Sequence, residues 1–218
     1  MKTHRVLAAT TMLALSLTLV ACNNKPAPAG SSSKPAAETS QGSAPMQKAP
    51  AKTKVSLADW EGTWNGFHGY LDNPELDSTY EEVAGRDSKK ADEVKAEIKK
   101  KVAADFTGIT IKGDKISFLD GFEKDGGKEL SSATYSFVES RKVTHGGAEL
   151  EWDIFKANEA DAPYPYMVLM PVHGEEELVH FHLRYGNSID DIMARDDWYP
   201  TFVAPSSTMG QIKEEIKE

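Results

Sequence analysis

After Ala104, apolar residues recur at every second position, and this alternation constrains the fold more than any other feature of the sequence. A period of two places successive side chains on opposite faces of an extended chain, so it predicts strands. Residues 107–119 predict two strands around a Gly-Asp turn, which is typical of a hairpin. Two further strand pairs are expected, 133–140 with 149–155 and 164–170 with 178–185.

Helices are predicted on both sides of this strand region. The clearest has Val94, Ile98 and Val102 at every fourth position, which gives it one apolar face. The expected helices are 74–83 with Pro74 in its first turn, 87–104 capped by Asp87 or Ser88, 188–192, and a last one from Ser206 or Ser207 to the C-terminus.

A short opening strand within residues 57–67 brings the expected number of strands to about seven. Short turns between consecutive strands favour antiparallel neighbours, and many such strands are typical of a barrel. We therefore predict a mainly β fold with flanking helices, of the α+β class, built on a closed or nearly closed antiparallel barrel. Residues 55–218 are long enough to form it as one domain.

The first 22 residues resemble a lipoprotein signal peptide. After a basic start, residues 6–20 form an uncharged apolar run that is too short to span a bilayer. The run ends in Leu19-Val20-Ala21-Cys22, which resembles a bacterial lipobox, where cleavage precedes a cysteine that becomes acylated. Cys22 is the only cysteine of the chain, and a free thiol would be a liability in an oxidising compartment. We expect residues 1–21 to be removed and Cys22 to carry the lipid, on the outer side of a bacterial membrane, facing the periplasm or the cell surface.

The composition of residues 22–54 predicts a disordered tether between the lipid anchor and the folded domain. They are rich in Pro, Ala, Ser and Lys, and such a segment cannot bury enough apolar surface to offset its chain entropy. The first 54 residues hold seven basic residues and one acidic residue, so the formal charge of −9 for the whole chain leaves −15 on residues 55–218. An acidic domain argues against nucleic acid and against direct binding to an anionic membrane, because both need clustered Lys and Arg. Membrane contact is expected through the lipid alone.

Two of the six histidines, His180 and His182, stand two positions apart in a predicted strand. They therefore share one face, with Cβ atoms roughly 6.5–7 Å apart. Imidazoles at this spacing can turn toward one metal ion, since Zn–N bonds are about 2.0–2.1 Å long. A pair of exposed or hydrogen-bonded imidazoles would show the same spacing, so the pair alone leaves both interpretations open.

His173 offers a third ligand, because a hairpin of 164–170 with 178–185 brings its loop close to His180. Three histidines leave a fourth position for water, a carboxylate or a ligand from a partner. Glu175, Glu176 and Glu177 lie in the same loop and could donate an oxygen or attract cations. His68, in a glycine-rich segment, is a weaker candidate, and His145 is expected to be structural or exposed in a turn.

Two other classes of function remain open at this point. A three-histidine zinc site with bound water also describes a hydrolase or hydratase, although no general base or oxyanion donor can be named here. A barrel could instead bind a small apolar ligand with Trp60, Trp64 and Phe67, although such aromatic residues more often form the core. The sequence has no Gly-X-Ser-X-Gly, Cys-X-X-Cys or His-Glu-X-X-His motif.

The sequence resembles the ZinT family of bacterial zinc-binding proteins, whose domain also forms the C-terminal part of some zinc-uptake lipoproteins. The likeness covers residues 57–205. It is carried by the opening Leu-Ala-Asp-Trp-Glu-Gly-Thr-Trp at 57–64, the stretch 71–80, His-Phe-His at 180–182 with the following Gly186-Asn187, and Asp-Trp-Tyr-Pro-Thr at 197–201.

The resemblance implies a lipocalin-like (calycin) barrel that binds Zn²⁺ through three histidines. Matched by position, His180 and His182 are the paired ligands and His173 is the upstream one. Here Val172 precedes His173 and the intervening loop is shorter than is usual in the family. The implied role is zinc homeostasis, in which a lipid-anchored protein supplies zinc to the substrate-binding protein of an ABC importer. Other divalent transition metals would also fit an imidazole site.

Overall fold

Eight antiparallel strands form a closed barrel, in which each strand pairs with its neighbours in chain order. The structure is a computed structural model, and it describes residues 54–145, 147–174 and 178–218. The barrel closes where β1 and β8 pair, at Asn65 with Val203 and Gly66 with Phe202. The strands are β1 (Gly62–Gly66), β2 (Gly108–Lys112), β3 (Lys115–Leu119), β4 (Glu129–His145), β5 (Ala148–Ala157), β6 (Tyr166–Leu169), β7 (His180–Gly186) and β8 (Thr201–Val203).

The strand that the sequence did not reveal is β8. It has only three residues, between Pro200 and Ala204, so it is too short to display an alternating pattern. It nevertheless lies between β1 and β7, and Thr201 is the register partner of His182. The predicted class, mainly antiparallel β with flanking helices, is confirmed.

The barrel interior is filled with side chains. Phe181 and Leu183 of β7 are fully buried in it, and the rings of Trp64 and Phe181 meet edge to face at 4.9 Å. Trp60 packs edge to face on Phe155 at 5.7 Å. Because β7 alternates, its even-numbered residues face outward, away from this core.

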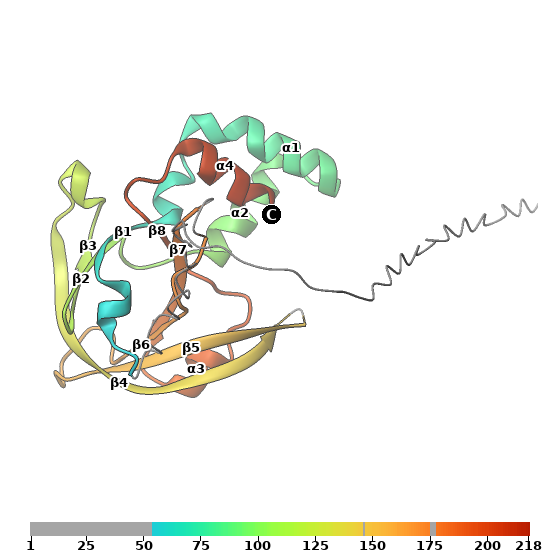
Figure 1. Ribbon diagram of the computed structural model, residues 1–218. Helices are drawn as coiled ribbons and strands as arrows, with labels where there is room; N and C mark the ends of the chain where they lie inside the picture. The colour runs from blue at the N-terminus through green and yellow to red at the C-terminus, as the bar shows by residue number, and fades with distance from the viewer. Residues whose placement is uncertain (1–53, 146, 175–177) are drawn as a thin grey trace, which may run out of the picture. The chain divides into compact units, whose positions relative to one another are not determined.

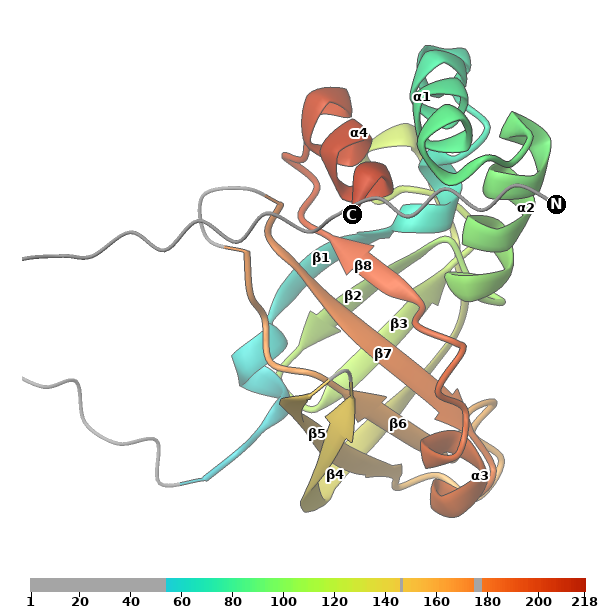
Figure 2. The same cartoon turned by 90° about the vertical axis from the view of Figure 1, so that its right-hand side faces the viewer.

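Three helices gather at one end of the barrel, and α3 (Ile189–Met193) lies at the other (Figures 1 and 2). The three are α1 (Asp77–Asp87), α2 (Ala91–Lys101) and α4 (Met209–Lys217). Their apolar faces pack on outward-facing barrel residues that include Leu178 and Val203. Short 3-10 segments connect these elements: η1 (Leu57–Trp60), η2 (Phe67–Tyr70), η3 (Pro74–Leu76) and η4 (Glu123–Asp125).

The predicted boundaries around residue 88 were wrong. Asp87 ends α1 rather than capping the next helix, and Ser88 takes a left-handed conformation with φ of 56°. The N–H of Lys89 then donates to the carbonyl of Ala84 at 2.9 Å, which closes the C-terminus of α1. The last helix likewise starts later than expected, with Thr208 as its N-cap.

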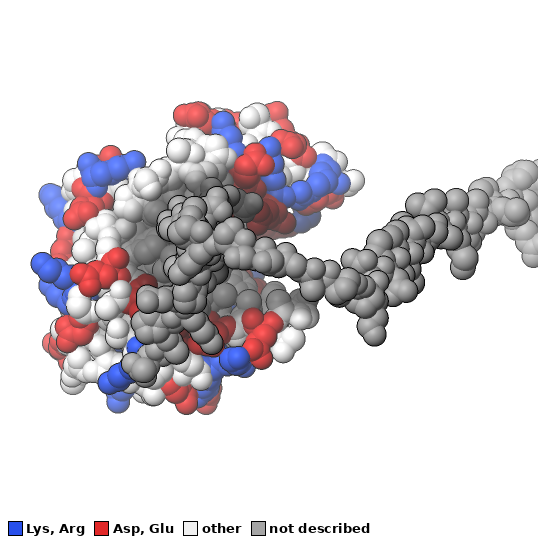
Figure 3. Space-filling view, viewed as in Figure 1, with Lys and Arg blue, Asp and Glu red and all other residues white. Residues whose placement is uncertain are grey.

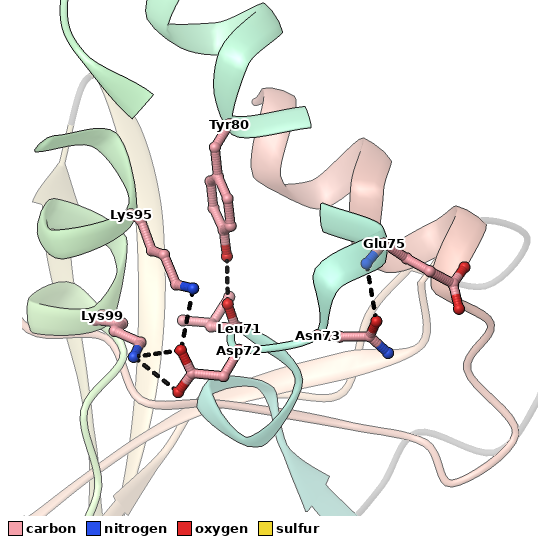
Figure 4. A network of polar contacts seen from close by, with 7 residues as sticks. All are labelled: Leu71, Asp72, Asn73, Glu75, Tyr80, Lys95 and Lys99. Carbon is pink, nitrogen blue, oxygen red and sulfur yellow. Dashed lines mark hydrogen bonds and ion pairs between the residues drawn. The ribbon is translucent and has the colours of Figure 1, made fainter. Parts of the chain in front are cut away.

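A polar network holds α2 against the segment that precedes α1 (Figure 4). The Asp72 carboxylate pairs with Lys95 at 3.1 Å and with Lys99 at 2.7 Å. The hydroxyl of Tyr80 donates to the carbonyl of Leu71 at 3.0 Å, and it is buried. The ion pairs are exposed and contribute little stability each, but together these contacts fix the helix that forms one wall of the site described below.

The described surface carries charges of both signs. On the face seen in Figure 3, blue and red side chains are interspersed over the visible part of the domain. Among the residues that the structure describes, no helix has the length and apolar character that crossing a bilayer requires. The expected signal peptide, the anchor at Cys22 and the tether up to residue 53 lie outside the described residues.

Candidate metal centre

Backbone pairing brings the three predicted histidines together. His180 and His182 lie on β7 and face outward, on the side of the helices. Just before β7, His173 forms an isolated antiparallel bridge with His180. Two residues joined directly across antiparallel strands point to the same face. The hairpin expected from the sequence therefore places the third imidazole beside the other two.

The three rings surround one small volume. Their centroids are separated by 4.0 Å (His173–His180), 5.1 Å (His180–His182) and 5.5 Å (His173–His182). One ring nitrogen from each lies within 4.8 Å of the corresponding nitrogens of the other two. A tetrahedral zinc ion needs these separations to be about 3.3 Å.

Backbone carbonyls fix the tautomers of two rings. His173 Nδ1 lies 2.9 Å from the carbonyl oxygen of Pro171, and His180 Nδ1 lies 2.6 Å from that of Leu178. A carbonyl oxygen only accepts, so each Nδ1 carries the proton and donates it. Nε2 is therefore the ring nitrogen with which each of these histidines would bind a metal.

The third ring is fixed through Thr201. The Thr201 hydroxyl donates its only proton to the carbonyl of Tyr199 at 2.9 Å. Its oxygen, 3.0 Å from His182 Nδ1, must then accept from that nitrogen. Each imidazole thus carries a proton on Nδ1 and is oriented by a hydrogen bond of the kind that positions metal ligands.

His173 and His182 line a cavity of about 450 Å³ between the barrel wall and the helices. His173 is exposed, His182 is partly buried and His180 is buried, so the group is reached from the His173 and His182 side. Helix α2 contributes Ile98 and Lys101 to the lining, and α4 contributes Glu215 and Ile216. Met170, Tyr199 and Thr201 line the barrel side, and His145 and Leu150 line the cavity from the β4–β5 hairpin.

Burial favours the neutral form of His182 and of His180. It lowers the pKa of His182 to about 3, with further contributions from His180, His173, Lys101 and Arg184. It also lowers the pKa of His180, and the neighbouring His173 acts in the same direction. Neutral imidazole is the form that coordinates a metal, so protons compete weakly with a cation at these two rings.

A buried arginine supports the same face of β7. Arg184 is 3% exposed, and its guanidinium lies between the rings of Trp152 at 4.6 Å and Tyr199 at 4.5 Å. Its Nε donates to the carbonyl of Trp198 at 2.8 Å. Tyr199 in turn packs edge to face on His182 at 5.8 Å. The arginine thus fixes an aromatic residue that touches the site.

The other predicted site residues are not brought into this group. Within the described ranges, the cluster of potential metal ligands consists of the three histidines, and His68 lies apart from it in η2. Glu175 and Glu176 are outside the described residues. Trp60 and Trp64 belong to the packed barrel core rather than to a ligand pocket, and Phe67 lines the cavity on the outside.

Sequence reasoning missed two residues of the site. Thr201 was not recognised because its strand was not, and the only available signal was its place after Pro200 within a segment shared with the family. His145 was expected to be structural or exposed. It is exposed, but it also lines the cavity that holds His173 and His182.

Comparison with known proteins agrees with the fold and with the metal. The model of the ZinT family, described as periplasmic lipocalin-like zinc-recruitment proteins, matches residues 45–218. The Zn(II)-bound ZinT-like domain of Streptococcus pneumoniae AdcA superposes with a TM-score of 0.58 at 24% identity, over 78% of this chain and 94% of that one. Zn(II)-bound AdcA of the same species gives 0.60 at 24% identity, over 74% of this chain and 35% of that one. At this identity the two structures show a common fold.

Two curated relatives extend the comparison. The probable metal-binding protein YrpE of Bacillus subtilis (strain 168) is 26% identical over 149 residues, 67% of this chain and 57% of that protein. The zinc-binding protein AdcA of Streptococcus pyogenes serotype M1 is 27% identical over 165 residues, 73% of this chain and 32% of that protein. The chain therefore spans between a third and somewhat over half of the length of these relatives.

The family match covers most of the chain, and the lipocalin-like fold and the expectation of Zn²⁺ are both confirmed at the level of the family. The chain belongs to the ZinT family of lipocalin-like zinc-recruitment proteins.

Proposed function

We propose that this protein binds one zinc ion through the Nε2 atoms of His173, His180 and His182 and supplies it to a zinc uptake system. One observation carries the proposal: three imidazoles converge, and the Nδ1 of each is occupied by an acceptor. The metal-binding nitrogen of each ring is therefore free and directed by the fold.

The donor set fits the proposed cargo. Three imidazoles with a fourth position open are a common zinc arrangement. An open position also suits transfer, because an incoming ligand can attach before the first ligands leave. The proposed role is binding and transfer rather than catalysis.

The proposal also covers the cellular location of the protein. The family description is periplasmic, and the N-terminal sequence resembles a lipoprotein signal with Cys22 as the acylated residue. We place the domain outside the cytoplasm, anchored by lipid at Cys22 to a bacterial membrane. Its expected partner is the substrate-binding protein of a zinc ABC importer, the class of protein with which this domain is fused in some zinc-uptake lipoproteins.

Metal analysis of the purified domain tests the proposal. Protein purified without added metal and then titrated with Zn²⁺ is expected to bind one ion per chain. A double variant, His180→Ala with His182→Ala, should bind more than about 100-fold more weakly, a loss beyond that of an outer-shell residue.

His68→Ala is the matched control, because it removes an imidazole outside the cluster. It should bind zinc as the unaltered protein does. Zinc binding that survives the double substitution would contradict the proposal, as would an unaltered protein that takes up no zinc. Competition with Cu²⁺ and Ni²⁺ would then show which metal the site prefers, since geometry and availability rather than raw affinity decide selectivity.

A further inference from the structure

The β4–β5 hairpin extends beyond the barrel as a two-stranded ribbon (Figure 1). Strand β3 pairs with β4 only as far as Thr134, and β6 pairs with β5 only from Asp153 onward. Residues 141–145 and 148–152 therefore pair with each other alone. Val143 and Leu150 of this ribbon pack on a hydrophobic cluster that includes Trp152 and Ile192.

The ribbon ends at the metal cavity. His145, the last residue of β4, lines the cavity together with His173 and His182, and so does Leu150 of β5. His145 is exposed to solvent. It is thus an imidazole that reaches both the solvent and the cavity of the three-histidine group.

One tyrosine ring separates His145 from that group. Tyr199 lies 5.7 Å from His145 and 5.8 Å from His182, measured between ring centroids. The Tyr199 hydroxyl is 3.4 Å from Nδ1 of His145, a long and weak hydrogen bond, which leaves Nε2 of His145 available. The Tyr199 ring therefore contacts both His145 and one of the three proposed ligands, His182.

The charged groups of the cavity favour a cation on this path. The charged side chains among its lining residues are the carboxylates of Asp196, Glu215 and Glu218 and the ammonium of Lys101. Three negative charges against one positive charge raise the local concentration of a divalent ion. A cation that enters this cavity meets the imidazole of His145 at its edge.

We propose that His145 is a transient zinc ligand, which binds the ion as it enters or leaves the three-histidine site. This inference rests on the proposed function and adds a step to it. When zinc leaves, the ion passes from His182 to His145 beside the Tyr199 ring that both imidazoles contact. A nitrogen ligand on this path stabilises the partly released ion, which lowers the barrier in both directions. The stability of the final three-histidine complex does not depend on His145.

Kinetics of zinc exchange test the proposal. Association with Zn²⁺ and dissociation to a fluorescent chelator would be followed by stopped flow in the full chain and in a His145→Ala variant. Both rate constants should fall by roughly tenfold, which corresponds to about 1.4 kcal/mol on the barrier. The equilibrium Kd should change by less than about twofold, because a barrier shared by both directions cancels in the ratio.

Thr144→Ala is the matched control, because Thr144 is exposed, precedes His145 on the same ribbon and does not line the cavity. It should leave both rate constants unchanged. Added imidazole should restore fast exchange in His145→Ala and not affect Thr144→Ala, which separates a missing ligand from a disturbed ribbon.

Unchanged rates in His145→Ala overturn the inference while the proposed function stands. A loss of affinity as large as that of His182→Ala would make His145 a permanent ligand, and this also overturns the inference. If the unaltered chain binds no zinc, the proposed function itself has failed.

Discussion

His173 and His180 face each other across two antiparallel segments, and the N–H of each donates to the carbonyl of the other, at 2.9 and 3.0 Å. The position of the third proposed ligand is therefore set by the backbone. A side chain placed in this way loses little entropy when it binds a metal. Any change that breaks the bridge should weaken zinc binding without touching an imidazole.

Gly174 is the residue on which this bridge depends most. Its φ is +81°, and a Cβ added there would collide with the carbonyl oxygen of Leu178. We expect Gly174→Ala to shift His173 away from His180 and to weaken zinc binding by about 10-fold or more, comparable to the loss of an outer-shell contact. Competition with a chelator of known affinity measures this.

Gly113→Ala is the control for the conformation alone. Gly113 also has a positive φ, +60°, but a Cβ there would meet no atom within 4 Å, and the residue lies in the β2–β3 turn. The free energy of unfolding of Gly113→Ala should fall by about 1–2 kcal/mol, because alanine disfavours the left-handed conformation. The variant should bind zinc normally. Equal zinc affinity in both variants would show that the bridge does not position His173.

Thr201→Val tests the orientation of His182. Valine keeps the shape of threonine but removes the oxygen that accepts from Nδ1. The ring would then be free to turn or to change tautomer, so we expect zinc affinity to fall by about 10–100-fold, as for other outer-shell partners. A zinc titration at neutral pH gives the value.

Thr201→Ser should retain most of the affinity, because it keeps the hydroxyl between Tyr199 and His182. If valine and serine behave alike, the tautomer of His182 is fixed by something other than this residue.

The contrast between His173 and Thr201 shows what the sequence could predict. His173 was placed beside His180 because a hairpin needs only local information: two alternating runs and a loop between them. Thr201 reaches His182 through β8, a strand of three residues whose partners are β1 and β7. This strand forms because the barrel closes, and three residues are too few to show the alternating pattern that predicts a strand.

The predicted helix boundaries were wrong for a related reason. The run from Asp87 to Ala104 has the composition of one helix, but Ser88 takes the left-handed conformation and α2 begins at Ala91. Separate packing of α1 and α2 against the barrel overrides local propensity here. The cavity, and with it the position of His145, depends on this packing, so the sequence could indicate the ligands but not what surrounds them.

The stability of the metal-free protein should fall in mild acid. Burial lowers the pKa of His182 to about 3, whereas histidine in an unfolded chain titrates near 6.5. Below pH 6.5 the unfolded state binds a proton that the folded state does not, so folding becomes less favourable as pH falls toward 3. His180 acts in the same direction. For His182 the loss between pH 6.5 and 5 is at most about 2 kcal/mol.

Denaturant unfolding of the metal-free protein at pH 7.5, 6.5 and 5 measures this loss. The His182→Gln variant should lose less over the same interval, because its side chain does not titrate. An NMR titration of His182 in the metal-free protein should show a neutral ring at pH 5. A ring that titrates near 6.5 would contradict the assigned burial effect.

We expect substitution of Arg184 to lower the free energy of unfolding and to leave zinc coordination intact. Arg184→Met keeps an aliphatic chain between Trp152 and Tyr199 but removes the donor to the Trp198 carbonyl and the cation between two rings. We expect a loss of about 2–4 kcal/mol of unfolding free energy, from a charged hydrogen bond together with two cation–π contacts. Zinc affinity should stay equal or rise slightly, because a positive charge that acts on His182 has been removed.

Arg86→Met is the matched control, since Arg86 is exposed and pairs with Asp87 at the surface. The free energy of unfolding of Arg86→Met should differ from that of the unaltered protein by less than about 1 kcal/mol. Denaturant curves and zinc titrations on both variants separate the two effects. A large loss of zinc affinity in Arg184→Met, at a temperature where the variant is fully folded, would mean that the guanidinium and the Tyr199 ring it holds position the imidazoles directly.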